Sequence, residues 1–538
     1  MSATATASPA AATAAPDSAI ATIAYNPATG EILGQSRLDD VRDLPALVAR
    51  ARAAQATWEK TPVRSRSAAM LRIRDYIVAH ADELAETISR DNGKTRADAM
   101  ATEIVPVTMA ISYYARKAPR FLADRRLMPG NPLLAFKLAK IARVPFGVIG
   151  IIAPWNYPFA IPFSEVVMGV LAGNAVILKT ATETQLVGRA LAACMDAAGL
   201  PEGLFTFVNL PVRLAGDALL ENGIDKLFFT GSVGVGKKLM AKAAETLTPV
   251  SLELGGNDAM IVCADADLER AAAGATWAGM QNAGQSCGGV ERIYVEESVY
   301  EPFLHSLAAR VRRLRVGYDD SWNVDMGAIT TKNQLNTIRE HVAEALAKGA
   351  KIYAQSACPG GNGGAGLFHP AMVLTEVDHT MRVMCEETFG PVVGVMKVRS
   401  IDEAIELAND SNLGLTGSVW SRNRAAAEKI ARRIRAGVVM INDHLMSHGL
   451  AETPWGGFKE SGIGRTHGDI GFAEMTEPQC IVHDYLPGVK KNMWWYPQSK
   501  GVYDGLKGIA NLLYGSDLAS RAAGLGQLLR LFPRTFRS

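Results

Sequence analysis

The segment FFTGSVGVGK, residues 228–237, has the pattern from which α/β folds are built, a buried strand that ends at a glycine-rich turn before a helix. Ser232 is a candidate N-cap, and the helix is expected to begin near Val233. The glycines allow a bulky anion, such as a dinucleotide pyrophosphate, to approach backbone N–H groups at the helix start. Because the spacing is not GxGxxG, a turn that binds nothing is an equal alternative for this segment alone.

Strand and helix patterns alternate along the rest of the chain. Short apolar runs predict buried strands at residues 148–152, 175–178, 226–229, 259–262, 292–295, 392–396 and 417–420. Helical spacing of apolar residues predicts helices at 41–59, 65–88, 186–198, 212–220, 299–313 and 333–348. This alternation predicts an α/β protein with a doubly wound, Rossmann-like cofactor domain followed by a second α/β domain.

Composition excludes several classes of protein. A chain of 538 residues with 48% hydrophobic and 20% charged residues is typical of a soluble globular protein with two or three domains. The net charge of +2 argues against a nucleic-acid partner. The six cysteines form no CxxC and there is no histidine cluster, so we expect no metal site and no disulfide framework. A reducing, cytoplasmic location fits best.

The N-terminal segment and the apolar runs argue against membrane targeting. Met1–Ala21 is rich in Ala, Thr, Ser and Pro and is predicted to be disordered. The first basic residue is Arg37, so the positive start of a signal peptide is missing. No apolar run reaches the roughly 18–20 residues that span a bilayer.

The C-terminal segment has a composition of its own. From Pro487 onward it holds eight Lys or Arg and two Asp, together with Trp494-Trp495-Tyr496 and a helical pattern over 509–532. One interpretation is an arm that packs on a partner subunit or domain; the other is a basic amphipathic helix on a membrane surface. The first is favoured because interspersed glycines weaken the helix.

Three residues are candidates for catalysis. Cys287, in NAGQSC, follows Glu253, in LELGG, by 34 residues. A thiol attacks a carbonyl carbon and a carboxylate takes a proton from water, so this couple could form and hydrolyse a thioester. Asn156, in PWNYP, offers an amide that could stabilise an oxyanion. The alternatives are a small buried cysteine and a structural asparagine in a proline-bounded turn.

Two further motifs offer cofactor contacts. Lys179 closes the strand pattern GNAVILK and could donate to a ribose hydroxyl or a phosphate. In EETFGPV, residues 386–392, Glu387 could accept from a ribose and Phe389 could lie against an aromatic ring. A solvated lysine and a solvated acidic turn are the ordinary alternatives.

Taken together and in this order, the motifs resemble those of the NAD(P)-dependent aldehyde dehydrogenase superfamily over roughly Tyr25–Tyr485, including a closing segment PWGGFKESG at 454–462. The resemblance implies the hydrolytic type of the family, which does not transfer the acyl group to coenzyme A. Cys287 would be the nucleophile, Asn156 and the Cys287 backbone N–H would hold the oxyanion, and Glu253 would activate water. The implied cofactor-binding residues are Trp155, Lys179, Thr182, Gly231, Ser232, Glu387 and Phe389.

Two departures from the family pattern carry information. The family commonly has a Glu, in Lys-Pro-Ser-Glu, at the position of Thr182, and here Glu183 lies one step beyond. A carboxylate would repel a 2′-phosphate, whereas Thr182 offers a hydroxyl, so we expect NADP⁺ to be accepted and even preferred over NAD⁺. The other departure is the segment after Tyr485, which is longer than in most members.

The resemblance also implies a domain plan. It places the cofactor-binding domain at 22–124 and 146–255, the catalytic domain at 256–457, oligomerisation segments at 125–145 and 471–487, and a basic, aromatic extension at 488–538. The expected partners are a small-molecule aldehyde and further copies of the chain in a homodimer or homotetramer. Two other readings of the same residues are a thioesterase or esterase without redox chemistry and a binding protein that has kept the fold. No Arg or His stands out as a clamp for a substrate carboxylate.

Overall fold

The computed structural model describes residues 21–359 and 366–537, and it contains two compact units. The larger unit holds the described residues up to Ala123 together with Arg143–Glu477, and the smaller holds Asp124–Ala142 and the segment from Pro478 onward. The N-terminal segment predicted to be disordered lies outside the described residues apart from Ala21, which begins strand β1 (Ala21–Tyr25).

The first sheet of the larger unit has the strand order β19-β9-β8-β5-β6-β7. Its strands are β5 (Val148–Ile152), β6 (Ala175–Lys179), β7 (Phe205–Val208), β8 (Lys226–Thr230), β9 (Val250–Glu253) and β19 (Gly462–Ile463). Strands β5 to β9 are parallel, and every residue of β5, β6 and β8 is buried. The chain runs outward from β5 to β7 and then returns to β8 beside β5, which confirms the predicted doubly wound sheet.

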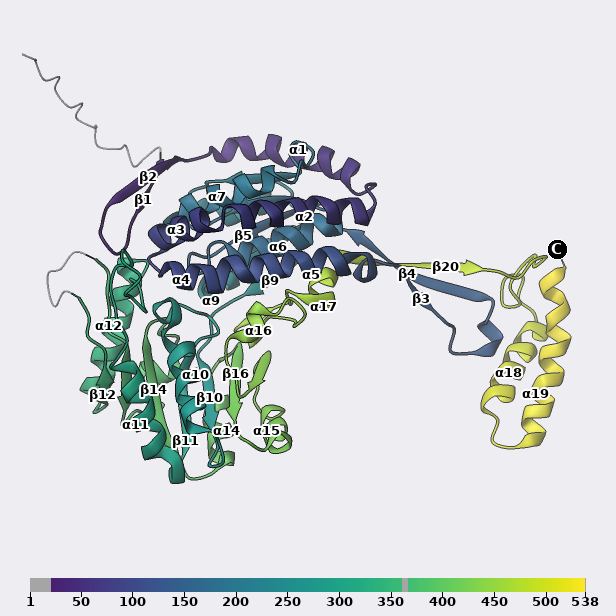
Figure 1. The fold of residues 1–538 in the computed structure, drawn as a ribbon. Coiled ribbons are helices and arrows are strands. Elements are labelled where there is room, and N and C mark those ends of the chain that lie inside the picture. Colours follow the sequence, from purple (N-terminus) through teal and green to yellow (C-terminus); the bar gives the residue numbers. More distant parts are fainter. Residues whose placement is uncertain (1–20, 360–365, 538) are drawn as a thin grey trace, which may run out of the picture. The chain divides into compact units, whose positions relative to one another are not determined.

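Helices pack around this sheet, as the purple and blue part of Figure 1 shows. They are α1 (Leu44–Trp58), α2 (Val63–Ala79), α3 (Ala81–Asn92), α5 (Val105–Phe121), α6 (Ala160–Ala172), α7 (Gln185–Asp196), α8 (Val212–Glu221) and α9 (Val233–Ala243). The continuous helix predicted over 65–88 is wrong, because the chain breaks between α2 and α3 at His80. There the ring Nδ1 lies 2.9 Å from the carbonyl oxygen of Tyr76 and competes with the helical hydrogen-bond pattern.

The second sheet of the larger unit has the order β12-β13-β14-β11-β10-β16-β17, and only the described pairing of β12 with β13 is antiparallel. Its strands are β10 (Asp258–Val262), β11 (Val290–Glu296), β12 (Lys351–Gln355), β13 (Met372–Thr375), β14 (Val392–Val398), β16 (Thr416–Trp420) and β17 (Val438–Ile441). Its helices are α10 (Leu268–Met280), α11 (Tyr300–Val311), α12 (Lys332–Ala347), α14 (Ile401–Asn409) and α15 (Arg424–Ala431). Each sheet has its own hydrophobic core, so the predicted α/β class is confirmed for both.

The strand ends bring the sequence motifs to the edges of the two sheets. In the first sheet Lys179, Thr230 and Glu253 each close a parallel strand, so they share its carboxyl edge. In the second sheet Cys287 and Phe389 each precede a strand by three residues, so they share its amino edge. Ligands of open α/β sheets bind at the carboxyl edge where the strand order reverses.

The smaller unit contains most of a three-stranded sheet with the order β20-β4-β3, formed by β3 (Arg125–Leu127), β4 (Lys137–Pro145) and β20 (Thr476–Asp484). It also contains a helical hairpin, drawn in yellow in Figure 1. The single helix predicted over 509–532 is wrong: α18 (Lys500–Tyr514) ends before Gly515, and Asp517 caps α19 (Leu518–Leu531) by accepting from the Ser520 N–H at 2.7 Å. The glycines lie where the helices meet, since a Cβ on Gly508 would overlap the backbone of α19. No helix in the described ranges is long and apolar enough to cross a bilayer.

Candidate active site

A strained turn carries Cys287 to the edge of the second sheet. Helix α10 stops at Met280, and η5 (Gln281–Gly284) contains left-handed backbone, including Asn282 with φ 51°. Left-handed non-glycine residues cost about 1–3 kcal/mol each, so the surroundings must hold them. The Asn282 backbone N–H donates to Asp98 Oδ2 at 3.1 Å, and its side-chain amide donates to the Asn156 carbonyl at 2.9 Å.

Glycines allow the segments around the thiol to approach one another closely. Gly284 has φ +71°, and a Cβ there would overlap the backbone of Gly390 in the 386–392 motif. A Cβ on Gly256, in the LELGG motif, would overlap the carbonyl oxygen of Cys287. Because both positions are glycines, the Cys287 loop can pack closely between the 386–392 motif and the LELGG motif.

Cys287 lines a mostly apolar cavity of about 320 Å³. Burial raises the pKa of its thiol well above the usual value, and the negative charges of Glu253 and Glu387 raise it further, whereas the Gly288 N–H opposes the rise. The thiol is therefore protonated at neutral pH and needs a base before it can attack a carbonyl carbon.

Glu253 ends strand β9 and lies in the same part of the structure. Burial raises its pKa to about 8, and the opposing influences are a hydrogen bond from Trp455 and the charge of Arg465. Trp455 also lines the cavity that Cys287 lines. A carboxyl group with a pKa near neutrality is suited to general-base catalysis.

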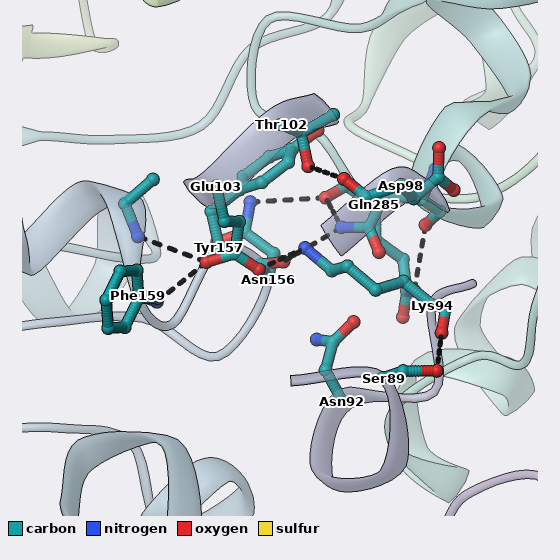
Figure 2. Close-up of polar contacts among 12 residues, drawn as sticks. Ser89, Asn92, Lys94, Asp98, Thr102, Glu103, Asn156, Tyr157, Phe159 and Gln285 are labelled. Carbon is teal, nitrogen blue, oxygen red and sulfur yellow. Dashed lines mark hydrogen bonds and ion pairs between the residues drawn. The ribbon is translucent and has the colours of Figure 1, made fainter. Parts of the chain in front are cut away.

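Asn156 follows strand β5 and is almost fully buried. One hydrogen of its amide Nδ2 is donated to the Gln285 carbonyl at 3.2 Å, two residues before the thiol, and the second remains available. The backbone carbonyl of Asn156 accepts a hydrogen bond from Lys94 Nζ at 2.9 Å, which holds this residue in place (Figure 2). The structure therefore brings Cys287, Glu253 and Asn156, all selected from sequence, into one site.

A buried polar network beneath Asn156 was missed by sequence reasoning. Lys94 Nζ pairs with Glu103 Oε1 at 2.6 Å, and neither side chain has any exposed surface. Glu103 lies on a π-helical turn, η2 (Met100–Ile104), and its other oxygen accepts from the Phe159 and Ala160 N–H groups at 2.7 and 3.0 Å (Figure 2). π-Helical turns are frequent at functional sites, and here the turn points a carboxylate inward.

Glu165 is a second acid that sequence reasoning missed. It lies on α6 and is buried; burial and the charge of Glu253 raise its pKa to about 8. Glu165 Oε2 and Glu253 Oε1 are buried without a hydrogen-bond partner among the described residues, and both side chains line one small cavity. The sequence carries a signal for Glu165, because it is the only charged residue of an otherwise apolar helix.

The groups at the carboxyl edge of the first sheet fit a phosphate-bearing cofactor. Lys179 is 2% exposed, and no acceptor in the described part of the chain pairs with its ammonium group. Ser232 is the N-cap of α9, and its side chain makes no capping hydrogen bond, so the N–H groups of the first turn are open. Gly231, just before it, donates its N–H to the Glu253 carbonyl at 3.0 Å. A helix N-terminus and an unpaired ammonium together suit a pyrophosphate.

The other cofactor candidates lie on two loops. Glu387 Oε1 accepts from the Gly256 N–H at 2.8 Å, and Phe389 packs edge-on against Trp155 with ring centroids 5.5 Å apart. Burial raises the pKa of Glu387 well above its usual value. Thr182 begins a half-buried 3-10 turn after β6. The structure thus joins Glu387 and Phe389 to the catalytic motifs, and places Thr182 beside the strand that Lys179 ends.

Glu291 holds the loop of the 386–392 motif and was also missed. Its carboxylate accepts from the Phe389 N–H at 2.7 Å and from the Asn257 amide at 2.8 Å. No local sequence pattern distinguishes Glu291, because charged residues near the start of a strand are common. Within residues 21–359 and 366–537 no cluster of His, Cys, Asp or Glu could hold a metal ion.

Known proteins share this sequence and fold over most of their length. The aldehyde dehydrogenase family profile matches residues 15–481. The chain is 36% identical over 496 residues to a 4,4′-diapolycopene aldehyde oxidase of Methylomonas sp., covering 92% of this chain and 91% of that protein. It is 39% identical over 460 residues to a putative NADP⁺ succinate-semialdehyde dehydrogenase of Mycolicibacterium smegmatis, covering 84% and 87%.

Solved structures agree with the sequence relatives. Betaine aldehyde dehydrogenase of Staphylococcus aureus, solved in complex with NAD⁺, has a TM-score of 0.82 at 30% identity, covering 89% of this chain and 96% of that chain. Aldehyde dehydrogenase of Brucella melitensis biovar abortus has a TM-score of 0.81 at 32% identity, covering 87% and 94%. The chain therefore belongs to the aldehyde dehydrogenase family and is an NAD(P)-dependent oxidoreductase.

Proposed function

We propose that the enzyme oxidises an aldehyde to its carboxylic acid with NAD⁺ or NADP⁺ through a covalent intermediate on Cys287. The observation that carries this proposal is that three groups lie in one site beside an apolar cavity. Cys287 lines the cavity, the charge of Glu253 acts on the pKa of its thiol, and the Asn156 amide donates to the Gln285 carbonyl in the Cys287 loop.

The first half of the reaction uses the thiol and the amide. Glu253 accepts the thiol proton, and the Cys287 sulfur forms a bond to the aldehyde carbon, giving a thiohemiacetal. The oxygen that becomes negative accepts from the free hydrogen of the Asn156 amide and from the Cys287 backbone N–H. When bound, the nicotinamide supplies the hydride acceptor, and the acyl group is left on Cys287 as a thioester.

The second half of the reaction uses Glu253 as a base. The proton that Glu253 took from the thiol is first released to solvent, so the carboxylate is free to take a proton from water while the water oxygen attacks the thioester carbon. The carbon–sulfur bond then breaks, the acid leaves, and the proton now held by Glu253 returns to the sulfur and restores the thiol. Because this acid is buried beside the thiol, water is a competent acceptor of the acyl group here and a coenzyme A thiol is not required.

Seven residues are proposed to bind the cofactor, and each has supporting geometry. Lys179 and the α9 start, with Gly231 and Ser232, offer donors to the phosphates and ribose, and Glu387 offers an acceptor. The Trp155–Phe389 pair offers aromatic surface to the nicotinamide end. Thr182 offers a hydroxyl where family members commonly carry a carboxylate, which supports acceptance of NADP⁺ and a preference for it.

The cofactor dependence and the nucleophile are tested together. Cys287→Ala is expected to abolish aldehyde-dependent formation of NADH and NADPH while cofactor binding, followed by fluorescence quenching, is kept. Cys480→Ala, at an exposed cysteine of the smaller unit, is the matched control and should keep full activity. Aldehyde oxidation by Cys287→Ala would contradict the proposal. Ester hydrolysis that needs neither cofactor nor aldehyde would favour the esterase reading instead.

The assembly and the domain plan stay predictions. We propose a homodimer or homotetramer formed through 125–145 and 471–487, because β20 (Thr476–Asp484) is exposed along most of its length and an open strand invites pairing. Residues 22–124 with 146–255 and residues 256–457 are proposed as the cofactor-binding and catalytic domains. Light scattering with multi-angle detection measures the number of subunits.

The extension 488–538 has two candidate roles. Contact with a partner subunit is favoured over contact with a membrane surface, although the hairpin exposes apolar residues such as Tyr503, Tyr514 and Leu518 beside its lysines and arginines. Cosedimentation with anionic vesicles, with and without residues 488–538, separates the two roles. The cytoplasmic location is likewise a proposal, supported by the six free cysteines.

A further inference from the structure

The cavity lined by Cys287 has no ionised side chain among the described residues of its wall. It is lined by the start of α5 and the turn before it, by the start of α6, by α10 and by the segment 445–455. None of its lining residues, all of them in the described part of the chain, is an Asp, Glu, Lys or Arg. His448 is the one lining histidine, and burial lowers its pKa to about 4, so it is neutral at pH 7.

Two polar side chains of the cavity wall use their donors within the protein, and one acceptor, Gln281 Oε1, is buried without a partner among the described residues. Gln281 donates to the Tyr157 hydroxyl, and the Thr102 hydroxyl donates to the Asp98 carbonyl at 2.7 Å. Burial also raises the pKa of Tyr157, so this phenol carries no charge. A substrate group placed here meets hydrocarbon and aromatic surface, and an ionised group would lose its water without gaining a counter-charge.

The mouth of the cavity is apolar as well. Five large hydrophobic side chains of the lining are also exposed to solvent: Val105, Met109, Trp277, Met446 and Leu450. Single exposed hydrophobic residues are ordinary on a protein surface, but a group of them around one opening marks a binding surface. An extended substrate that fills the cavity would continue across this rim.

We propose that the substrate is an uncharged aldehyde with an extended hydrocarbon body, aliphatic or aromatic, and that short anionic semialdehydes are rejected. This inference rests on the proposed aldehyde oxidation at Cys287. In a four-carbon semialdehyde the carboxylate is three bonds from the reacting carbon and therefore stays inside the cavity, where no cation is available to pair with it. Arg74 and Arg116 line a neighbouring hollow that shares Met109 with the cavity, and Arg96 lines another that shares Val105, but none of the three lines the cavity itself.

The substrate class is tested by steady-state kinetics of the full chain at saturating NAD⁺ and, separately, NADP⁺. The panel is propanal, hexanal, decanal, 4-oxobutanoate, its methyl ester, and trimethylammonioacetaldehyde. We expect kcat/KM to rise about fourfold for each buried methylene, which corresponds to about 0.8 kcal/mol. Hexanal should then exceed propanal about sixtyfold, and the methyl ester should exceed the free acid by at least about a hundredfold.

The outcomes separate this inference from the function on which it rests. Turnover of 4-oxobutanoate or of the trimethylammonium aldehyde at or above that of hexanal would overturn the substrate class and leave aldehyde oxidation intact. Equal kcat/KM for propanal, hexanal and decanal would overturn it too. Failure to oxidise any aldehyde with either cofactor would instead refute the proposed function.

Two matched leucines test the cavity mouth. Leu450, at the rim, is 37% exposed, and Leu346, on α12 outside the cavity, is 38% exposed. Leu450→Arg should lower kcat/KM for decanal about tenfold and raise it for 4-oxobutanoate, whereas Leu346→Arg should leave both unchanged. Met446→Arg, at a second rim position, should also lower kcat/KM for decanal and raise it for 4-oxobutanoate. This variant provides the test if Leu450→Arg does not fold. Rim variants that change neither substrate would contradict the proposal.

Discussion

Lys94 and Glu103 form an ion pair at 2.6 Å in which both side chains are completely buried. The same ammonium donates to the Asn156 carbonyl, and the same carboxylate accepts from the first N–H groups of α6. The pair therefore links the loop that carries Asn156 to the helix that follows it. A buried pair adds little net stability over an apolar replacement, but removal of one partner leaves an uncompensated charge.

Lys94→Met is expected to lower the free energy of unfolding by about 3–5 kcal/mol, because Glu103 would remain buried without its counter-charge. The loss should also reduce kcat more than it changes KM, because Asn156 loses an anchor while the cavity walls are unchanged. Denaturant unfolding and steady-state kinetics measure the two effects. Lys94→Met combined with Glu103→Gln should recover part of the stability.

An exposed ion pair gives the control for this prediction. Lys397 and Glu297 are 3.3 Å apart, and their side chains are 52% and 61% exposed. Lys397→Met should change the free energy of unfolding by about 0–1 kcal/mol at most and leave kcat unaltered. Equal effects of Lys94→Met and Lys397→Met would contradict the role assigned to the buried pair.

Glu253 is expected to set the pH dependence of thioester hydrolysis. A base acts in its deprotonated form, so a pKa of about 8 predicts a hydrolysis rate that rises with pH and levels off above about 8. Glu253→Gln should give a burst of reduced cofactor followed by a slow steady state that lacks this rise. Stopped-flow absorbance between pH 6 and 9 measures both phases. A hydrolysis rate that stays constant between pH 6 and 9 in the parent enzyme would argue against Glu253 as the base.

The parts of the fold that could be predicted are those with a local signature. The run predicted as a strand at 226–229 is β8 (Lys226–Thr230), because a strand buried on both faces leaves an uninterrupted apolar run. Cys287, Glu253 and Asn156 were identified because each lies in a short motif, and the parallel strands bring these motifs to one place. The glycines at 255, 256 and 284 belong to the same motifs because backbone segments meet there.

The parts that could not be predicted depend on partners distant in sequence. Lys94 and Glu103 lie in segments whose composition is that of ordinary surface helices, and only tertiary packing buries them. The break between α18 and α19 near Gly515 could not be predicted, because glycines within a helical pattern indicate only a weakened helix. In the structure the glycines of 505–524 allow the two helices to pack closely. Glu165 could have been found, since a lone acid in an apolar helix needs an explanation.

Glu165→Gln is expected to move the pH profile of hydrolysis to lower pH. The charge of Glu253 raises the pKa of Glu165, and because such coupling is mutual, an ionised Glu165 also opposes ionisation of Glu253 near and above pH 8; the variant removes that opposition. The variant should therefore reach its plateau below the pH of the parent enzyme. An exposed acid, Glu202, provides Glu202→Gln as the control, which should leave the profile in place.

The same substitution has an expected effect on stability. The pKa of Glu165 is raised in the folded protein to about 8, so the folded state favours the protonated acid. The contribution of protonated Glu165 to the free energy of unfolding is fully present below the pKa of about 4.5 in the unfolded chain. It is lost as pH rises through the folded-state pKa of about 8. As pH rises from 5 to 9, the Tm of the parent protein should therefore fall further than the Tm of Glu165→Gln. An identical loss in both proteins would show that Glu165 does not stay protonated at neutral pH.

Thr182→Glu is expected to shift cofactor use toward NAD⁺. A carboxylate at this half-buried position would repel a 2′-phosphate, whereas it could accept a hydrogen bond from a ribose hydroxyl. The kcat/KM for NADP⁺ should fall by about tenfold or more, a change of about 1.4 kcal/mol, and that for NAD⁺ should hold or rise. Glu183→Gln, which removes the exposed neighbouring charge, is the control and should raise the value for NADP⁺ slightly if at all. A parent enzyme more than about tenfold better with NAD⁺, or a Thr182→Glu variant with an unchanged ratio, would remove Thr182 as the determinant.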